Sequence, residues 1–246
     1  MITITVVLIY IIASFTQGVT GFGFGIFSMP LISMIYTPGI AIGINAILGT
    51  INCTYNYILL RKHVNYRKSM RFLMIGSLFI PFGAYFLVKA NEQLIFIIMG
   101  LTVICVTLHT MRSSRQYGES YLSRKKGTLF SIMAGMVAGA FASPGPILAP
   151  FMFAHERDPY VAKANLQFIF TVMSGVIIIS HILARNLTMH TLGMAAPYIP
   201  VVFLFTKLGS ILSFRMKKTL FKKLETAALL VLGTYILCKN LLILCF

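Results

Sequence analysis

The residues of this chain with the clearest potential for chemistry are glycines, hydroxyls and amides embedded in apolar sequence. The first group runs Gln17-Gly18-Val19-Thr20-Gly21-Phe22-Gly23-Phe24-Gly25-Ile26-Phe27-Ser28-Met29-Pro30. Glycine and proline weaken helices, and a bare backbone amide in hydrocarbon costs several kcal/mol unless protein or water satisfies it. A helix break at this point therefore has to be buried or to line a cavity, where backbone N–H groups are available to a ligand.

A second break follows about half a chain later, at Ala142-Ser143-Pro144-Gly145-Pro146. Paired breaks at matching places in two halves are the strongest sequence indication of a transporter's binding site. A broken helix presents the N-terminus of its second half inside the membrane, where unpaired N–H groups and the positive end of the helix dipole favour an anion. Glycines let that ligand approach the backbone closely, and Thr20, Ser28 and Ser143 add hydroxyl donors nearby.

Carboxylates and clusters of metal ligands are missing from the middle of the apolar segments. All five acidic residues fall at connections or segment ends: Glu92, Glu119, Glu156, Asp158 and Glu225. A cation site or a carboxylate proton relay would normally need one deep in a span. The four cysteines stand singly, with no metal-ligand spacing. The sequence therefore favours an anion site without a metal or cofactor.

Amides and hydroxyls recur at corresponding depths in the two halves. The segment after the first break contains Asn45, Thr50 and Asn52, and the segment after the second contains Asn165, Gln167, Thr171 and Ser174. Such groups either link helices or bind substrate, and their matched positions favour a role in the site. The predicted substrate-binding residues are Thr20, Gly21, Gly23, Gly25, Asn45, Ser143, Gly145, Asn165 and Gln167.

Close helix packing is the alternative role for the glycines. Gly21 and Gly25, and likewise Gly135 and Gly139, have the small-xxx-small spacing of membrane helix contacts. We favour packing for the second pair and ligand access for the first. Lys163 could attract an anion, but we expect it at the interface, with its ammonium reaching toward water.

The composition requires a membrane around these motifs. Of the 246 residues 58% are hydrophobic and 11% are charged, and the mean hydropathy is +0.87, values that would not keep a soluble domain dispersed. The net charge of +16 is concentrated in basic stretches at 61–71, 112–126 and 214–223. Short basic loops beside apolar segments report orientation in the membrane. The basic loops could also contact anionic lipid headgroups. Because the basic residues lie in these loops, we do not expect the protein to bind nucleic acid.

Eight hydrophobic segments can position these residues in an all-α polytopic membrane fold. Six have the length of single spans: 40–60, 72–88, 93–111, 161–184, 191–213 and 225–245. The other two, 2–36 and 128–154, are too long for one straight crossing and contain the two breaks. We predict two four-segment pseudo-repeats, at 1–111 and 128–246, joined by a basic cytoplasmic linker at 112–127.

The positions of the basic loops bear on how the broken segments run. If every segment crosses once, 214–223 falls on the face opposite 61–71 and 112–126, against the positive-inside rule. If 2–36 and 128–154 instead enter and return as re-entrant hairpins, all three basic loops become cytoplasmic and the repeats become inverted. We favour the hairpins, and long broken helices that cross the membrane are the alternative.

The two breaks resemble each other and carry a family resemblance. Placing Pro30 on Pro150 puts Gly25 on Gly145, which indicates an internal duplication. The chain resembles the TauE/SafE family of sulfite and organosulfonate exporters in its length, in its four-plus-four layout, and in Gly21-Phe22-Gly23-Phe24-Gly25 before Pro30 and Ser143-Pro144-Gly145-Pro146 before Pro150. The second motif is poorer in glycine than the family pattern. The resemblance implies a permease of the inner cell membrane for small sulfur-containing or carboxylate anions that works without ATP.

Two other functions compete with a transporter. An anion channel would use the same residues, and non-saturating flux would distinguish it. An intramembrane hydrolase built on Ser174 and His181 is disfavoured, because side chains two turns apart on one helix cannot reach each other. No catalytic residue and no cofactor is predicted, and no nucleotide-binding motif occurs in the sequence. The expected partners are a small anion and the lipid bilayer, with a homo-oligomer left open.

Overall fold

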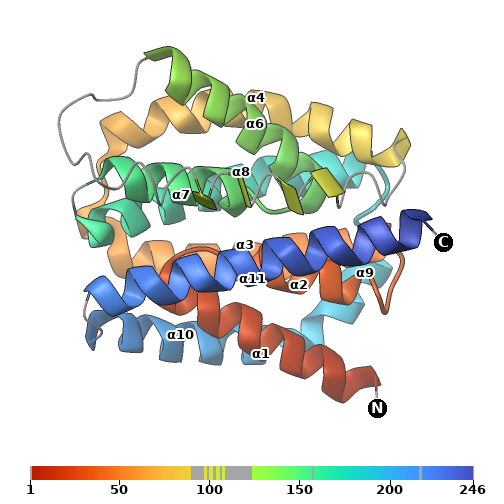
Figure 1. The fold of residues 1–246 in the computed structure, drawn as a ribbon. Helices are drawn as coiled ribbons and strands as arrows, with labels where there is room; N and C mark the ends of the chain where they lie inside the picture. Colours follow the sequence, from red (N-terminus) through yellow and green to blue (C-terminus); the bar gives the residue numbers. More distant parts are fainter. Residues whose placement is uncertain are drawn as a thin grey trace.

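The described part of the chain folds into a bundle of α-helices (Figure 1). The computed structural model describes residues 2–89, 124–156, 158–215 and 218–245, with four residue pairs between 97 and 108. The long helices are α1 (Ile2–Thr20), α3 (Pro38–Leu60), α4 (Tyr66–Lys89), α6 (Arg124–Phe141), α8 (Pro159–Leu183), α10 (Ile199–Arg215) and α11 (Lys218–Cys245). The shorter elements are α2 (Phe24–Ile32), α7 (Gly145–His155), α9 (Met189–Ala195) and the 3-10 turns η1 (Arg61–His63) and η2 (Ala196–Tyr198). The predicted all-α class is confirmed.

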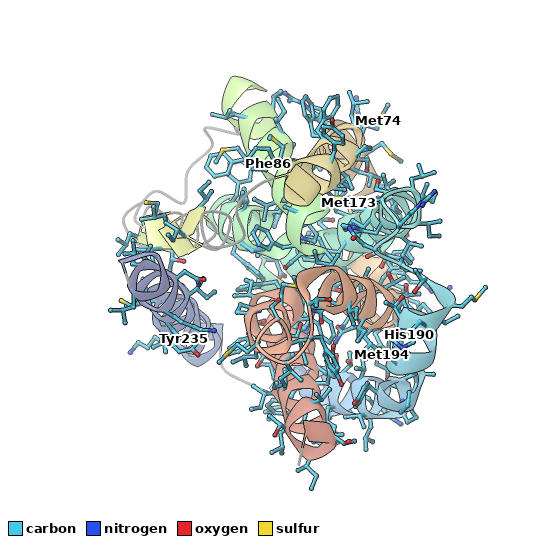
Figure 2. All side chains as sticks on the ribbon, turned by 90° about the vertical axis from the view of Figure 1, so that its right-hand side faces the viewer. Met74, Phe86, Met173, His190, Met194 and Tyr235 are labelled. Atoms are coloured by element: carbon cyan, nitrogen blue, oxygen red, sulfur yellow. The ribbon has the colours of Figure 1, made fainter. Side chains whose placement is uncertain are left out.

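Four stretches of the described helices are long and apolar enough to cross a membrane. They are Thr3–Thr20, Tyr66–Phe86, Tyr160–Leu183 and Met189–Ser213, the last of which runs through α9, η2 and α10. Large apolar side chains also cover the outside of the bundle, among them Met74 and Leu78, each 67% exposed (Figure 2). An apolar outer surface suits lipid rather than water. The chain is therefore a polytopic membrane protein, as predicted.

The first broken segment is a helical hairpin. α1 and α2 run in opposite directions (Figure 1), and Val6 of α1 shares a buried cluster with Ile32 of α2. The tip between them spans residues 21–23, where Gly21 and Gly23 have φ angles of 86° and 109°. Glycine adopts such angles at little steric cost. The local sequence thus ends the helix and turns the chain back, as the re-entrant interpretation requires.

The second broken segment makes the corresponding hairpin from α6 and α7. Phe130 near the start of α6 stacks on Phe151 of α7, with ring centroids 4.5 Å apart, so the two helices lie antiparallel. The tip spans residues 142–144, where Ala142 has a φ of 50°. The two hairpins enter the bundle from opposite ends and their tips meet in its interior (Figure 1).

The described parts of the basic stretches lie toward one end of the bundle. The α3–α4 turn, the start of α6 and the α10–α11 junction share this end, whereas both chain termini lie at the other (Figure 1). Lys68 of α4 also pairs with Glu156 after α7, with Nζ and Oε2 3.6 Å apart. This arrangement agrees with the parity argument for hairpins. Most of the predicted span 93–111 and most of the predicted linker 112–127 lie outside the described residues.

Glycines bring helices from the two halves into backbone contact. A Cβ added at Gly139 of α6 would lie 3.0 Å from Gly83 Cα on α4. In the same way, a Cβ added at Gly209 of α10 would lie 3.1 Å from Gly18 Cα on α1. The packing role of the α6 glycines is therefore confirmed. Each half contributes one hairpin helix and one later helix to these two crossings, which is the relation expected of pseudo-symmetric repeats.

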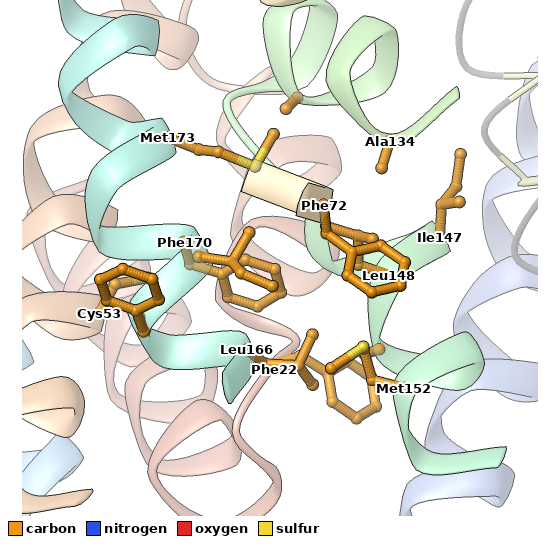
Figure 3. Close-up of a cluster of buried hydrophobic side chains, with 14 of the residues drawn as sticks. Phe22, Cys53, Phe72, Ala134, Ile147, Leu148, Met152, Leu166, Phe170 and Met173 are labelled. Carbon is orange, nitrogen blue, oxygen red and sulfur yellow. The ribbon is translucent and has the colours of Figure 1, made fainter. Parts of the chain in front are cut away.

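The main apolar core lies where the hairpin tips meet the central helices. Phe22 of the first tip, Leu148 of α7, and Phe170 and Met173 of α8 belong to one buried cluster (Figure 3). The helices that follow the two hairpins, α3 and α8, pack against each other beside it. This core holds both tips inside the protein, so the helix breaks are buried as the sequence predicts.

Candidate functional site

A cavity lies between the two hairpin tips, where the helix breaks face each other. Its lining comes from both hairpins, α3 and α8, and consists of Gln17, Gly23, Phe24, Gly25, Ala46, Gly49, Thr50, Cys53, Ala142, Ser143, Pro144, Gly145, Phe170, Ser174 and Ile177. The empty space among the lining residues, with the open mouth included, is about 390 Å³. The structure thus brings together four predicted residues, Gly23, Gly25, Ser143 and Gly145, from the two halves of the chain.

Glycine allows the tips to approach each other closely. A Cβ added at Gly25 would lie 2.5 Å from Ser143 Oγ, whereas a Cβ added at Gly145 would lie 3.4 Å from Phe22 Cβ. Real Cβ atoms do not tolerate the first distance, so the contact between the hairpins requires glycine at position 25. Gly145 has room for a methyl group, which would lie between the two tips.

α2 begins at the cavity, with the N–H groups of its first turn at this end. A helix leaves these groups without an intrahelical acceptor, and Gly23 caps α2 without a side-chain hydrogen bond. Phe24 N donates to Gln17 Oε1 at 2.9 Å. The N–H groups of Gly25 and Ile26 are the remaining first-turn donors, and the positive end of the helix dipole lies at the same place.

The start of α7 has fewer N–H groups than the start of α2, because Pro144 and Pro146 have none. Pro144 precedes the helix and Pro146 lies in its first turn, and proline has no N–H. Leu148 N already donates to Pro144 O at 3.3 Å. Gly145 and Ile147 are left as first-turn donors, so each break leaves two first-turn N–H groups at the cavity.

The hydroxyls of the cavity differ in what they can still bond. Thr50 and Ser174 each donate to the carbonyl four residues earlier on their own helix, at 2.6 Å and 2.7 Å. Their hydroxyl hydrogens are therefore occupied. The described residues provide no hydrogen-bond partner for the hydroxyl of Ser143. Ser143 is thus the lining hydroxyl that is ready to donate to a ligand.

The sequence-based prediction missed Gln17, although Gln17 begins the glycine motif. Its side chain is 4% exposed and joins two elements of the cavity. Its Nε2 donates to Cys53 Sγ on α3 at 3.1 Å, and its Oε1 accepts from Phe24 N of α2. An amide one turn before a helix break in an apolar segment is the sequence signal that could have identified it.

Three of the predicted residues shape the first tip and do not line the cavity. Thr20 Oγ1 accepts from Phe22 N at 3.2 Å and lies 2.9 Å from the carbonyl of Thr16. Gln167 Nε2 of α8 donates to Gly21 O, and Gln167 Oε1 is buried with no hydrogen-bond partner among the described residues. The Thr20 contacts shape the turn at the end of α1, and Gln167 holds this turn against α8.

The two predicted asparagines lie apart from the cavity lining. Asn45 Oδ1 accepts from Tyr10 OH at 3.4 Å, and Asn45 Nδ2 lies 3.4 Å from Met29 Sδ. Asn165 Oδ1 accepts from Asn65 N at 2.7 Å, just before α4. Asn45 thus joins α3 to the first hairpin, and Asn165 joins α8 to the α3–α4 turn.

The expectation that Lys163 lies at the membrane interface is wrong. The side chain is 2% exposed, and its Nζ donates to Gly18 O at 2.5 Å, to Val19 O at 3.3 Å and to Ser213 Oγ at 2.9 Å. The two carbonyls belong to the last turn of α1, where no further N–H of the helix can reach them. Lys163 therefore caps the C-terminal end of α1. The carbonyls need this donor because the helix ends at Thr20.

The residues of the hydrolase alternative do not form a catalytic pair. Ser174 Oγ donates to Phe170 O at 2.7 Å, whereas His181 Nδ1 lies 3.3 Å from Asn186 Nδ2. A nucleophile and its base must lie within hydrogen-bond reach of each other. Ser174 and His181 therefore do not act together as nucleophile and base.

Comparison with known proteins agrees with the arrangement of helices and hairpins. The model of the sulfite exporter TauE/SafE family matches residues 6–236, which include both hairpins. Among curated proteins and solved structures no significant match is found. Members of the matching family are transporters and not enzymes. The chain therefore belongs to the sulfite exporter TauE/SafE family of membrane transporters.

Proposed function

We propose that this protein is a secondary transporter that moves a small anion through the cavity between the hairpin tips. One observation carries the proposal: the two hairpins enter from opposite ends of the bundle, and the second helix of each, α2 or α7, begins at this cavity (Figure 1). First-turn N–H groups and two positive dipole ends therefore converge on one buried space. An anion placed there gains from both helices, whereas a cation would be repelled.

The proposed contacts to the anion come from the backbone and one hydroxyl. Gly25 N and Gly145 N are free of intrahelical acceptors by their positions in α2 and α7, and Ser143 lies beside them. Gly23 leaves the approach to the first tip unobstructed. Hydrogen bonds from neutral donors to a charged oxygen are stronger than those between neutral groups. These four residues are therefore proposed as the binding residues.

The other predicted site residues are proposed to support the site from outside the cavity. Thr20, Gly21 and Gln167 fix the turn at the first tip. Asn45 and Asn165 hold the first hairpin and α8 in register with their neighbours. Precise positioning of backbone donors is what a binding site of this kind needs.

The proposed substrate is sulfite, an organosulfonate or a related sulfur-containing or carboxylate anion. The family match supports a sulfur anion, and the small cavity favours a compact one. Phe170 and Ile177 supply apolar walls, which suit the carbon end of a sulfonate or carboxylate. The charged oxygens would then face the hairpin tips.

Transport is proposed to proceed by alternating access in the inner cell membrane. The repeats at 1–111 and 128–246 would move relative to each other about the cavity, with the linker 112–127 and the basic loops in the cytoplasm. The energy would come from the gradient of the substrate, the membrane potential or a coupled ion. No nucleotide-binding motif in the sequence supports an ATP-driven cycle.

Two measurements on the purified protein test this function. A thermal-shift screen against sulfite, sulfate, thiosulfate, sulfonates and small carboxylates identifies a ligand, because binding to the folded state raises the melting temperature. Flux of the stabilising anion into proteoliposomes should then be saturable and depend on its gradient. Large non-saturating currents would indicate a channel instead. Absence of both stabilisation and flux for every anion would contradict the proposal.

A further inference from the structure

Lys163 is the one formal charge among the side chains that the structure describes as buried. It lies within the membrane-spanning stretch Tyr160–Leu183. An ionised side chain inside a membrane protein is costly, and it usually marks a functional place. The transport proposal above does not yet give Lys163 a function beyond capping α1.

No described carboxylate is placed to balance this charge. The structure describes two acidic side chains, Glu156 and Asp158. Glu156 pairs with Lys68 at 3.6 Å, and Asp158 accepts from Tyr160 N at 2.8 Å. The three hydrogen bonds of Lys163 Nζ go to neutral oxygens. Its contacts therefore satisfy its donors and leave its net charge uncompensated.

Lys163 of α8 contacts the end of α1, and this contact has an electrostatic consequence for the first tip. α1 ends and α2 begins within the same turn, at residues 20–24. The C-terminal end of α1 carries about half a negative charge, and the N-terminal end of α2 carries about half a positive charge. Side by side, these two ends would largely cancel for an approaching anion. The ammonium of Lys163 lies directly on the last carbonyls of α1.

We infer that Lys163 determines the charge selectivity of the transporter. Its ammonium neutralises the negative end of α1, so the positive end of α2 acts on the cavity without opposition and the tip has a net positive charge. A bound anion then supplies the missing counter-charge. The inference rests on the proposed function, since it concerns how the same cavity distinguishes anions from neutral solutes and cations.

The geometry offers a way to separate charge from hydrogen bonding at this place. Lys163→Gln keeps an amide that can donate to a carbonyl or to Ser213 but removes the charge. Lys163→Arg keeps the charge with a different donor geometry. Ser213→Ala removes one hydrogen bond of the ammonium and leaves the charge. Lys207→Met is the matched control, because Lys207 is an exposed lysine on α10 whose loss changes the net charge equally.

Apparent affinity is measured in proteoliposomes for the panel anion that the wild-type protein binds best, alongside the melting temperature without ligand. Lys163→Gln should weaken the affinity by about tenfold or more, as expected for loss of a charge near a desolvated anion. Lys163→Arg should retain most of the affinity. Ser213→Ala should lower the melting temperature without changing the affinity, and Lys207→Met should change neither.

The outcomes distinguish this inference from the proposed function. If the wild-type protein binds no anion of the panel, both are contradicted. If the wild-type protein binds an anion and Lys163→Gln binds it equally well, the proposed function stands and the inference is overturned, with Lys163 left as a structural cap. If Lys163→Gln does not fold, Lys163→Arg and Ser213→Ala decide. If the apparent affinity for the anion falls in both Ser213→Ala and Lys163→Arg, and by the same factor, the loss of affinity comes from altered packing around Lys163. That result would overturn the inference.

Discussion

Gly25 and Gly145 occupy equivalent places at the starts of α2 and α7 but have different neighbours. A methyl group at Gly25 would collide with Ser143, whereas one at Gly145 would lie 3.4 Å from Phe22 Cβ, an ordinary contact distance. Gly23 adds a φ of 109° that other residues rarely adopt. Substitution at positions 23 or 25 therefore mixes folding with binding, and Gly145 is the cleaner position for a test.

Gly145→Ala should weaken anion binding while leaving the fold intact. The added methyl group fits sterically but stands between the tips, where the anion would approach the backbone. Apparent affinity should fall by about tenfold or more, with the melting temperature close to wild type. Gly175→Ala is the control, because a Cβ there meets no atom of the described residues within 4 Å. If Gly145→Ala binds the anion with unchanged affinity, the anion does not approach the backbone of the second tip closely.

Asn165→Leu should lower stability and leave affinity unchanged. Asn165 Oδ1 accepts from Asn65 N at 2.7 Å, and loss of the acceptor leaves a half-buried N–H without this partner. This should cost about 0.5–1.5 kcal/mol and appear as a lower melting temperature without ligand. A weaker apparent affinity with an unchanged melting temperature would instead place Asn165 in the substrate path.

At the residue scale, the sequence predicted the glycines of the cavity better than its side chains. Glycine and proline in an apolar segment have a local consequence, the helix break, which Gly23 and Gly145 illustrate. The partners of Asn165 and Lys163 lie about 100 and 145 residues away in the chain. A local sequence pattern cannot indicate contacts between residues so far apart in the chain. For this reason the sequence did not predict the burial of Lys163 or the position of Asn165 in the fold.

At the scale of elements, the two hairpins depend on short helices that are buried on most sides. α2 has buried residues along its length, among them Phe24, Ile26, Met29 and Ile32. Such a helix has apolar residues on all sides, so its sequence does not show which side packs against which neighbouring helix. The distribution of basic loops predicted the hairpin path, but only the folded structure shows which atoms of the two tips meet.

Gly139→Ala should destabilise the crossing between α6 and α4. The added Cβ would lie 2.7 Å from Ala84 N and 3.0 Å from Gly83 Cα, so the helices must separate, at a cost of about 1–3 kcal/mol. The melting temperature in detergent measures this effect. Gly193→Ala on α9 is the control, since a Cβ there lies more than 4 Å from every atom in the described part of the chain. Equal melting temperatures for the two variants would contradict the close backbone contact.

At the scale of the whole molecule, the two halves are arranged about the shared cavity. α6 packs on α4 and α1 packs on α10, so each hairpin is held by the opposite half. The family match over residues 6–236 is consistent with one continuous unit. Composition and charge predicted this class of molecule, because the amount of apolar sequence and the spacing of basic loops are properties of the whole chain.

Cysteine accessibility tests the orientation of the whole molecule. Single cysteines replace exposed residues in a functional, cysteine-free protein: His63 and Lys223 at the basic end and His190 at the other. In intact cells an impermeant thiol reagent should label the cysteine at position 190 and reach the other two only after permeabilisation. Labelling at position 223 but not 63 in intact cells would contradict the hairpin topology.

The most direct test of the central claim, that the anion binds between the hairpin tips, is substrate protection of a cysteine placed at Ser143. The test uses a variant in which the native cysteines are replaced, including Cys53 of the cavity. The probe is an anion from the thermal-shift screen that is transported but does not react with thiols. This anion should slow modification of Ser143→Cys in proportion to its occupancy and should not protect Lys223→Cys. Equal modification rates of Ser143→Cys with and without a saturating transported anion would contradict the central claim.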